Sequence, residues 1–303
     1  MMVLIAAVLC LACVAGLRPR ALRSGVGNRA LSSGSVLHCL PSDTADVDSA
    51  STLHGQSARL NVVGSGVTAS AIPIHVAYIV DGNGRWAARQ GLDRHHGHAA
   101  GATVTVDIAK RSFALGVQVV TLYLFSTENW SRPRSEVDNI MALLENYLMD
   151  VASYLRDNDI RLCVIGQLHR LPTSCQLLIH QLSAAPSGVP AASAQRTLCL
   201  ALSYGGRDEI VQVCRDIASD ATLRPHEITE SLVSQHTATG RLGIPDPDLV
   251  IRTSGETRLS NFFLWQSAYS ELLFVDRLWP EWSADEAEEA IRAFAKKERR
   301  YGK

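Results

Sequence analysis

The sequence predicts an α/β fold, in which a six-stranded, mainly parallel sheet is flanked by helices. From residue 73 onward, short apolar runs of strand length alternate with longer segments of helical periodicity. This alternation is typical of a parallel sheet, because each strand needs a crossover before the next one. The chain has 303 residues, of which 47% are hydrophobic, and can bury a large core. We therefore expect one folded domain over residues 73–303.

The expected strands are short apolar runs, and the first of them is rich in β-branched and aromatic residues. They lie at 75–80, 117–124, 160–166, 197–203, 248–252 and 271–275. Between them, apolar residues recur three or four positions apart, which predicts helices. These lie near 98–115, 136–157, 173–184, 206–220, 227–237 and 284–298. In the second helix, apolar residues from Val137 to Leu155 share one face, which indicates a stripe packed on the core.

The N-terminal region differs in composition from the rest. Residues 3–17 form an apolar run that is short for a membrane span and typical of a signal-peptide core. Four arginines follow among small residues, and no acidic residue precedes Asp43, as in transit peptides. We expect a targeting segment at 1–30 and a disordered linker at 31–72. The combination favours a plastid; the alternatives are the endoplasmic reticulum and secretory route, or a weak membrane anchor.

Charge and cysteine usage exclude some classes of site. The net charge of −1 provides no global attraction to nucleic acid, so anion binding must come from local clusters. Seven cysteines show no paired metal-ligand spacing beyond Cys10 and Cys13, which lie inside the apolar run. The others are expected to be reduced core residues.

The most informative segment follows the first expected strand. It consists of Asp81, Gly82, Asn83, Gly84, Arg85 and Trp86. The glycines permit a tight turn, and if a helix opens near Arg85 its free N–H groups suit a diphosphate. Asp81 would repel that anion unless a cation lay between them, and Mg²⁺ prefers such oxygen ligands. The alternative is an ordinary turn, since Asp-Gly and Asn-Gly are common turn dipeptides.

Two further polar segments follow other strands, at 125–130 and 252–260. Ligands of open α/β sheets bind at the carboxyl ends of the strands, so one site could gather all three segments. Two groups of side chains suit anions, although surface arginines are usually only solvated. The first comprises Arg85, Arg94 and His98, and the second comprises Arg252, Arg258 and Ser260. Two such groups predict an enzyme that joins two diphosphate esters.

Several motifs occur in a fixed order along the folded part. They are DGNGRW at 81–86, GHAAG at 97–101, TLYLFSTENWSRP at 121–133, SYGGR at 203–207, PDPDLVIRTSGETRLSNFFLWQSAYSEL at 245–272 and LWPEW at 278–282. With these motifs the chain resembles a cis-prenyltransferase of the undecaprenyl diphosphate synthase family from about Pro73 to Gly302. The resemblance implies a Mg²⁺-dependent enzyme that condenses isopentenyl diphosphate onto an allylic prenyl diphosphate, releasing diphosphate.

The resemblance also assigns roles to residues. It implies that Asp81 and Glu271 hold the metal, and that Asp81 and Asn129 act in catalysis, Asn129 at the deprotonation step. Around the allylic substrate it implies Gly82, Asn83, Gly84, Arg85, Trp86, Arg94, His98, Phe125, Ser126, Trp130 and Arg132. Around isopentenyl diphosphate it implies Arg252, Arg258 and Ser260. Glu128 and Glu256 lie in the same motifs with less defined roles.

An elongating apolar product needs a dry hydrophobic tunnel, and the stripe from Val137 to Leu155 can form one wall of it. Leu124 is bulkier than the Ala common at this position in long-chain members, so we expect short or medium products. The family ending Arg-x-Gly, here 300–302, implies a homodimer. The lipid product suggests peripheral contact with a membrane, and no nucleic acid partner is expected.

A different class of function is a noncatalytic partner subunit of a heteromeric enzyme. Such family members generally lose the first Asp and much of the RTSGE segment, and this chain has both. A nucleotide-binding enzyme would require a glycine-rich loop of another pattern after the first strand. Departures from the family pattern are Val80, Cys199 and Ser203, of which the last two replace asparagines and can alter a supporting hydrogen bond.

Overall fold

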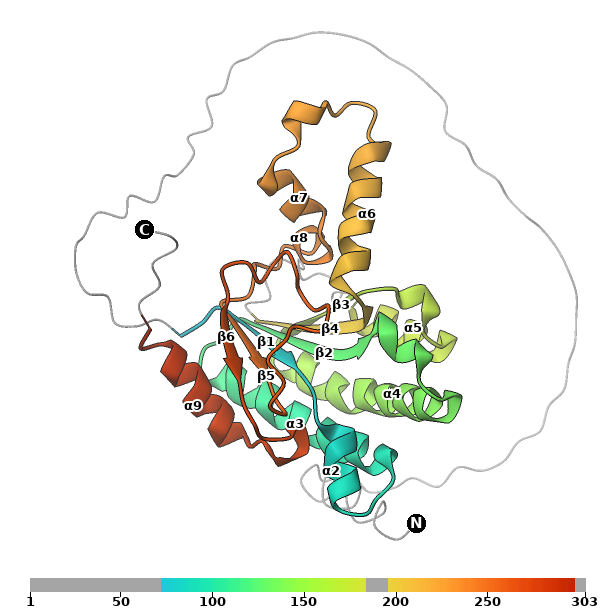
Figure 1. Cartoon of the computed structure of the whole chain (residues 1–303), viewed down its shortest axis with the longest axis vertical. Helices are drawn as coiled ribbons and strands as arrows, with labels where there is room; N and C mark the ends of the chain where they lie inside the picture. The colour runs from blue at the N-terminus through green and yellow to red at the C-terminus, as the bar shows by residue number, and fades with distance from the viewer. Residues whose placement is uncertain (1–71, 184–195, 298–303) are drawn as a thin grey trace, which may run out of the picture. The chain divides into compact units, whose positions relative to one another are not determined.

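The computed structural model describes residues 72–183 and 196–297 (Figure 1). The expected targeting segment at 1–30, the linker at 31–72 except its last residue, and the Arg-x-Gly ending lie outside these residues. The described part contains a six-stranded sheet in the order β3-β4-β2-β1-β5-β6, and every neighbouring pair is parallel. The expectation of a single α/β domain around such a sheet is confirmed.

The strands lie close to their expected positions. They are β1 His75–Ile79, β2 Val119–Ser126, β3 Ile160–Ile165, β4 Arg196–Tyr204, β5 Leu249–Arg252 and β6 Glu271–Phe274. All five residues of β1 and all four of β5 are buried, as expected for central strands covered on both faces. β2 extends further than expected, so Phe125 and Ser126 belong to its carboxyl end.

The helices agree with the expected pattern in position, with differences at their ends. They are α2 Asn83–Arg89, α3 Arg94–Ala114, α4 Arg134–Asp157, α5 Thr173–Ser183, α6 Gly206–Ser219, α7 Glu230–His236, α8 Ala238–Arg241 and α9 Ala284–Phe294. The helix expected at 227–237 begins later, because Thr229 caps α7 through its side chain. Thr237 then caps α8 in the same way, so the chain forms two short helices there.

Helices lie on both faces of the sheet. Figure 1 shows α3, α4 and α9 on one side of the sheet and α6, α7 and α8 on the other. On the first side, β1 and β2 contribute Tyr78 and Leu122 to a large apolar core that includes the stripe of α4 from Val137 to Leu155. The expected core-facing stripe is therefore confirmed. No helix among the described residues is long and apolar enough to span a bilayer.

On the second side, a smaller core gathers aromatic rings of the segment that joins β5 to β6. Tyr123 of β2 stacks on Phe262 with ring centroids 4.6 Å apart, and Phe262 stacks on Phe263 at 4.2 Å. Both phenylalanines are fully buried. This packing fixes the return of the chain from the carboxyl end of β5, where polar residues gather.

Candidate active site

The three polar segments meet at the carboxyl edge of the sheet because β1 lies between β2 and β5. Ile79 of β1 pairs with Tyr123 on one side and with Arg252 on the other. Each strand then continues into its polar segment at the same level. The structure thus brings together residues that are more than a hundred positions apart in sequence.

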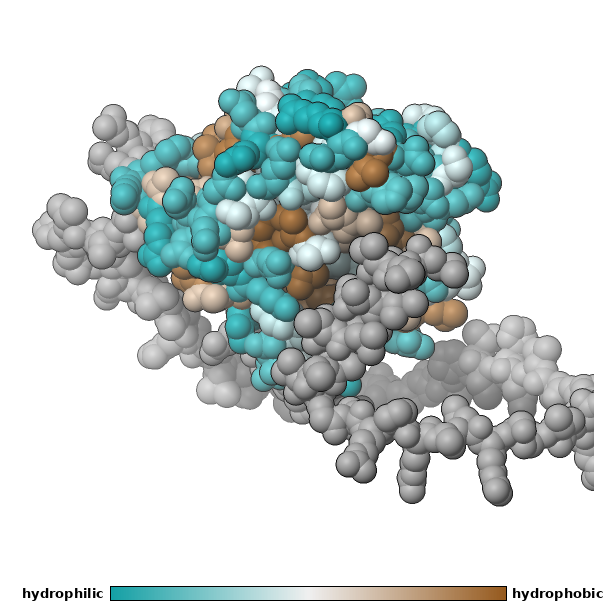
Figure 2. Space-filling view, turned by 90° about the horizontal axis from the view of Figure 1, so that it is seen from below, coloured by the Kyte–Doolittle hydropathy of each residue, from teal (hydrophilic) through white to brown (hydrophobic). Residues whose placement is uncertain are grey.

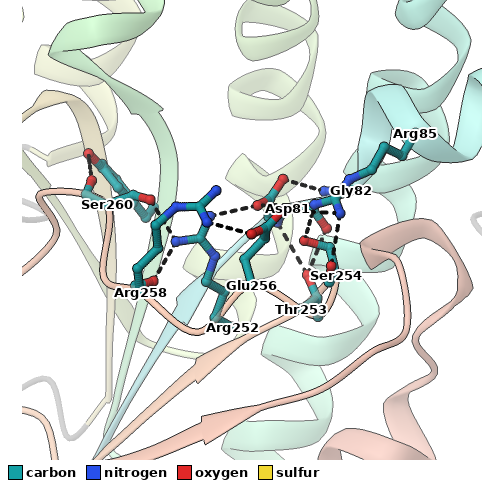
Figure 3. A network of polar contacts seen from close by, with 10 residues as sticks. Asp81, Gly82, Arg85, Arg252, Thr253, Ser254, Glu256, Arg258 and Ser260 are labelled. Carbon is teal, nitrogen blue, oxygen red and sulfur yellow. Dashed lines mark hydrogen bonds and ion pairs between the residues drawn. The ribbon is translucent and has the colours of Figure 1, made fainter.

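Asp81 is the centre of this edge (Figure 3). Its Oδ2 accepts a hydrogen bond from the buried guanidinium of Arg252 at 2.8 Å, and its Oδ1 accepts from the Gly82 N–H at 2.7 Å. Burial raises the pKa of Asp81, but the hydrogen bond and charge of Arg252, with the Gly82 N–H, outweigh burial and lower the pKa overall. Asp81 is therefore an ionised carboxylate that is one-third exposed to solvent, at 32%.

The turn after Asp81 depends on Gly82. Its φ of 106° lies in the left-handed region, and a Cβ there would lie 3.0 Å from the Cα of Leu278. The turn lets α2 begin at Asn83, two residues before the expected start. No side chain caps this helix, so the N–H groups of its first turn, which directly follows Asp81 and Gly82, have neither an intrahelical nor a capping partner.

The second anion-binding group differs from its expected form. Arg252 donates to the Ser260 hydroxyl at 2.6 Å and to the carbonyl of Arg258, so its guanidinium is engaged within the protein. Arg258 is 63% exposed and pairs with Glu256 at 2.5 Å. Glu256 also lies 3.3 Å from Arg85. Arg258 and Ser260 are thus the exposed groups of this set, while Arg252 supports them and Asp81.

A third cluster involves a residue that the sequence interpretation missed. The carboxylate of Glu136, on the first turn of α4, lies 3.0 Å from Arg132, 3.6 Å from Arg94 and 3.7 Å from His98. Glu136 is only 11% exposed. Burial and the charges of Arg132 and Arg94 lower the pKa of His98 against the effect of Glu136. The spacing of Arg132 and Glu136 by four residues was the available signal.

Glycines bring α2 and α3 into close contact beside this cluster. A Cβ on Gly97 would lie 2.0 Å from the carbonyl oxygen of Asn83, and one on Gly101 would lie 2.3 Å from Asn83 Oδ1. Asn83 Oδ1 and His98 Nε2 are buried and have no hydrogen-bond partner among the described residues. Both atoms belong to residues that line the same pocket.

That pocket is apolar beyond its polar end. Its lining residues are Val80, Asn83, His98, Gly101, Ala102, Thr105, Leu124, Phe125, Ile140, Met141, Leu143, Leu144, Tyr147 and Leu202. The cavity has a volume of about 80 Å³, so it contains little free space. Figure 2 shows apolar residues gathered in a hollow on the side of α3 and α4, with hydrophilic residues around it. Leu124 and the apolar stripe of α4 both contribute to the lining.

The segment after β2 forms the short 3-10 helix η1, Thr127–Ser131. Asn129 Oδ1 accepts from the Ser126 N–H at 3.1 Å, and the Ser126 hydroxyl accepts from the Asn129 N–H at 3.3 Å. The indole of Trp130 contacts Phe125 edge to face at 4.9 Å and donates to the Ser203 hydroxyl at 2.9 Å. Ser203, which departs from the family pattern, therefore still supplies a supporting hydrogen bond.

Glu271 does not lie with Asp81 in this chain. It begins β6 and pairs with Leu249, which is about 10 Å along the strand from Arg252. Its carboxylate is 2.6 Å from Lys297. Among the described residues, no cluster of three or more histidine, cysteine or acidic side chains is arranged to hold a metal. Asp81 alone nevertheless fits Mg²⁺, which is commonly held by one or two carboxylates together with substrate phosphates.

Comparisons with known proteins agree with this geometry. A family model described as "Putative undecaprenyl diphosphate synthase" matches residues 79–302. The isoprenyl transferase of Chlorobaculum tepidum is 43% identical over 77% of this chain and 86% of its own length. The dehydrodolichyl diphosphate synthase CPT5, chloroplastic, of Solanum lycopersicum is 42% identical over 76% of this chain and 74% of its own.

A solved structure has the same fold. Lavandulyl diphosphate synthase from Lavandula x intermedia, in complex with dimethylallyl diphosphate, matches with a TM-score of 0.71 and 35% identity. The match covers 77% of this chain and 99% of that one. Since the family model matches most of the folded part and two relatives are more than 40% identical, the chain belongs to the undecaprenyl diphosphate synthase family of cis-prenyltransferases.

Proposed function

We propose that this protein is a Mg²⁺-dependent cis-prenyl diphosphate synthase, which condenses isopentenyl diphosphate onto an allylic prenyl diphosphate and releases diphosphate. The observation that carries the proposal is the position of Asp81. It lies between two groups of cationic side chains at the sheet edge and close to the polar end of a narrow apolar pocket. Such a site suits two diphosphates and one apolar chain.

The allylic diphosphate would bind at the first turn of α2, with Arg94, His98 and Arg132 around it. Its apolar chain would extend into the pocket lined by Leu124 and the α4 stripe. Mg²⁺ bound by Asp81 and the diphosphate oxygens would offset the negative charge that develops as the allylic C–O bond breaks. The apolar lining of the pocket would exclude water, which would otherwise capture the allylic cation.

Isopentenyl diphosphate would bind through Arg258 and Ser260, with Arg252 holding both Ser260 and Asp81 in place. Its double bond attacks the allylic carbon as the C–O bond to diphosphate breaks, and the isopentenyl unit then loses a proton to the released diphosphate, which forms the new double bond. We assign Asn129 to the proton-loss step. The hydrogen bond from the Ser126 N–H orients its amide for this role.

Metal dependence and product synthesis are tested together. The full chain is incubated with labelled isopentenyl diphosphate and each of dimethylallyl, geranyl and farnesyl diphosphate, with Mg²⁺ or with a chelator, and the products are sized. Starter-dependent products that disappear with the chelator are expected. Absence of product with every starter would instead favour the noncatalytic partner subunit.

The targeting and assembly expectations remain part of the proposal. The chloroplastic tomato relative supports a plastid location, with the secretory route as the alternative. A fluorescent fusion to residues 1–72 tests this placement, because only a plastid signal would label that organelle. Light scattering of the purified chain tests the homodimer, and flotation with vesicles during synthesis tests membrane contact through the lipid product.

A further inference from the structure

The SYGGR motif at 203–207 has no role in the reaction proposed above, yet it lies at the same edge of the sheet. Ser203 supports Trp130, and the next residues contact the segment that follows β5. The Gly206 N–H donates to the carbonyl of Asn261 at 2.7 Å, and the Arg207 N–H donates to Asn261 Oδ1 at 2.9 Å. The motif therefore holds Asn261 by two backbone hydrogen bonds.

The side-chain nitrogen of Asn261 contacts another segment. Its Nδ2 donates to Oε1 of Glu128, in η1, at 2.8 Å. Burial raises the pKa of Glu128, but hydrogen bonds from its own backbone N–H and from Asn261 outweigh burial and lower it. Glu128 is thus an ionised acceptor, and the amide of Asn261 must be the donor. One side chain joins the segments that follow β2, β4 and β5.

The close approach of these segments is built into the backbone. A Cβ on Gly205 would lie 2.6 Å from Thr127 Oγ1 and 2.7 Å from Asn261 Nδ2, so a larger residue there would displace these two side chains. Ser260 and Asn261 both have positive φ, at 48° and 66°. Asparagine adopts this region more readily than most residues, whereas Ser260 holds it at a cost that its surroundings must offset.

We infer that Asn261 and Glu128 form a positioning pair, which holds Arg258 and Ser260 at the distance from Asn129 and Trp130 that aligns the two substrates. The inference rests on the proposed function. The segment after β2 has its own support, from the Ser126–Asn129 hydrogen bonds and from Ser203. Asn261 directly follows Ser260 in the chain, so loss of the pair acts first on the isopentenyl diphosphate side.

Exchanging the two side chains tests the pair. Asn261→Asp alone removes the amide donor and places a second carboxylate against Glu128, while one oxygen can still accept from the Arg207 N–H. Adding Glu128→Gln restores a hydrogen bond between one amide and one carboxylate. The amide donor then lies at position 128 and the carboxylate acceptor at position 261. The matched control is Asn139→Asp, the same change at an exposed position of α4.

We expect Asn261→Asp to lower kcat/KM for isopentenyl diphosphate at least about tenfold, because a hydrogen bond to the charged Glu128 is lost and two carboxylates then face each other. The dissociation constant of a non-reactive allylic thiodiphosphate, measured by calorimetry, should stay within about threefold. The double variant should recover kcat/KM to within about threefold of the parent. A double variant no better than Asn261→Asp, or equal losses for both substrates, overturns the inference.

A failure of the proposed function is distinguishable from a failure of the pair. If the parent chain forms no product, the function is wrong, and the same three variants are compared by thermal unfolding. If Asn261→Asp lowers the melting temperature and the double variant restores it, the pair is still supported. If the double variant does not restore the melting temperature, the inference is overturned.

Discussion

Asp81→Asn separates the structural role of Asp81 from its role in the reaction. The asparagine keeps an oxygen that can accept from the Gly82 N–H. It removes the negative charge that Arg252 contacts at 2.8 Å. Arg252 is only 5% exposed, and its Nε already lacks a hydrogen-bond partner among the described residues. In the variant, the positive charge of the buried Arg252 guanidinium therefore no longer faces a negative charge at this position.

The size of the stability loss follows from this burial. Removing one partner of a fully buried ion pair costs about 3–5 kcal/mol. Asp81 is 32% exposed, so solvent can replace part of the lost interaction, and we expect about 1–3 kcal/mol. For a domain of this size the melting temperature should fall by about 3–10 °C.

The contribution of the Asp81–Arg252 ion pair to stability depends on pH. The pKa of Asp81 is lowered in the folded state, so its contribution is fully present above the unfolded pKa of about 3.9. That contribution is lost as the pH falls through the lower, folded pKa. The difference in melting temperature between the parent and Asp81→Asn should be constant near neutral pH and shrink below about pH 4.

Activity and stability are measured on the same samples. We expect kcat/KM to fall at least about 100-fold at saturating Mg²⁺, because the carboxylate that would hold the metal is lost. Asp107→Asn, an exposed position of α3, is the control and should change neither quantity. Activity within about threefold of the parent would refute the metal assignment. An unchanged melting temperature at pH 7 would refute the ion-pair argument.

Three further predictions concern the pocket and its supports. Glu136→Gln removes a carboxylate within 3.0–3.7 Å of two arginines and His98 and should tighten inorganic diphosphate binding about 5–30-fold by calorimetry, whereas weaker binding would contradict this account. Leu124→Ala should lengthen the products in a radiolabelled assay, and an unchanged length distribution would remove Leu124 as a determinant. Gly97→Ala forces α2 from α3 and should lower the unfolding free energy by about 1–3 kcal/mol, measured in denaturant.

Local sequence determined the fold class and the place of the site. Alternating periodicities indicated six strands, and each polar segment was correctly placed at a strand's carboxyl end, where ligands of parallel sheets bind. Gly82 was identified as part of a permissive turn, because strand, carboxylate and glycine are adjacent in the chain. These features depend on neighbouring residues alone, so they can be recognised without knowing the order of the strands.

The tertiary structure decided how the side chains are paired. Arg252 was grouped with Arg258 and Ser260 as a diphosphate ligand, and the structure adds its ion pair with Asp81, which lies 171 positions away in the sequence. Asn261 gained its importance only from neighbours on other elements, and so did Glu136 through Arg94 and His98. Glu271 lies at the amino end of its strand, whereas Asp81 follows the carboxyl end of β1. Such pairings depend on strand order, register and side-chain conformation, which act between distant parts of the chain and leave no local pattern.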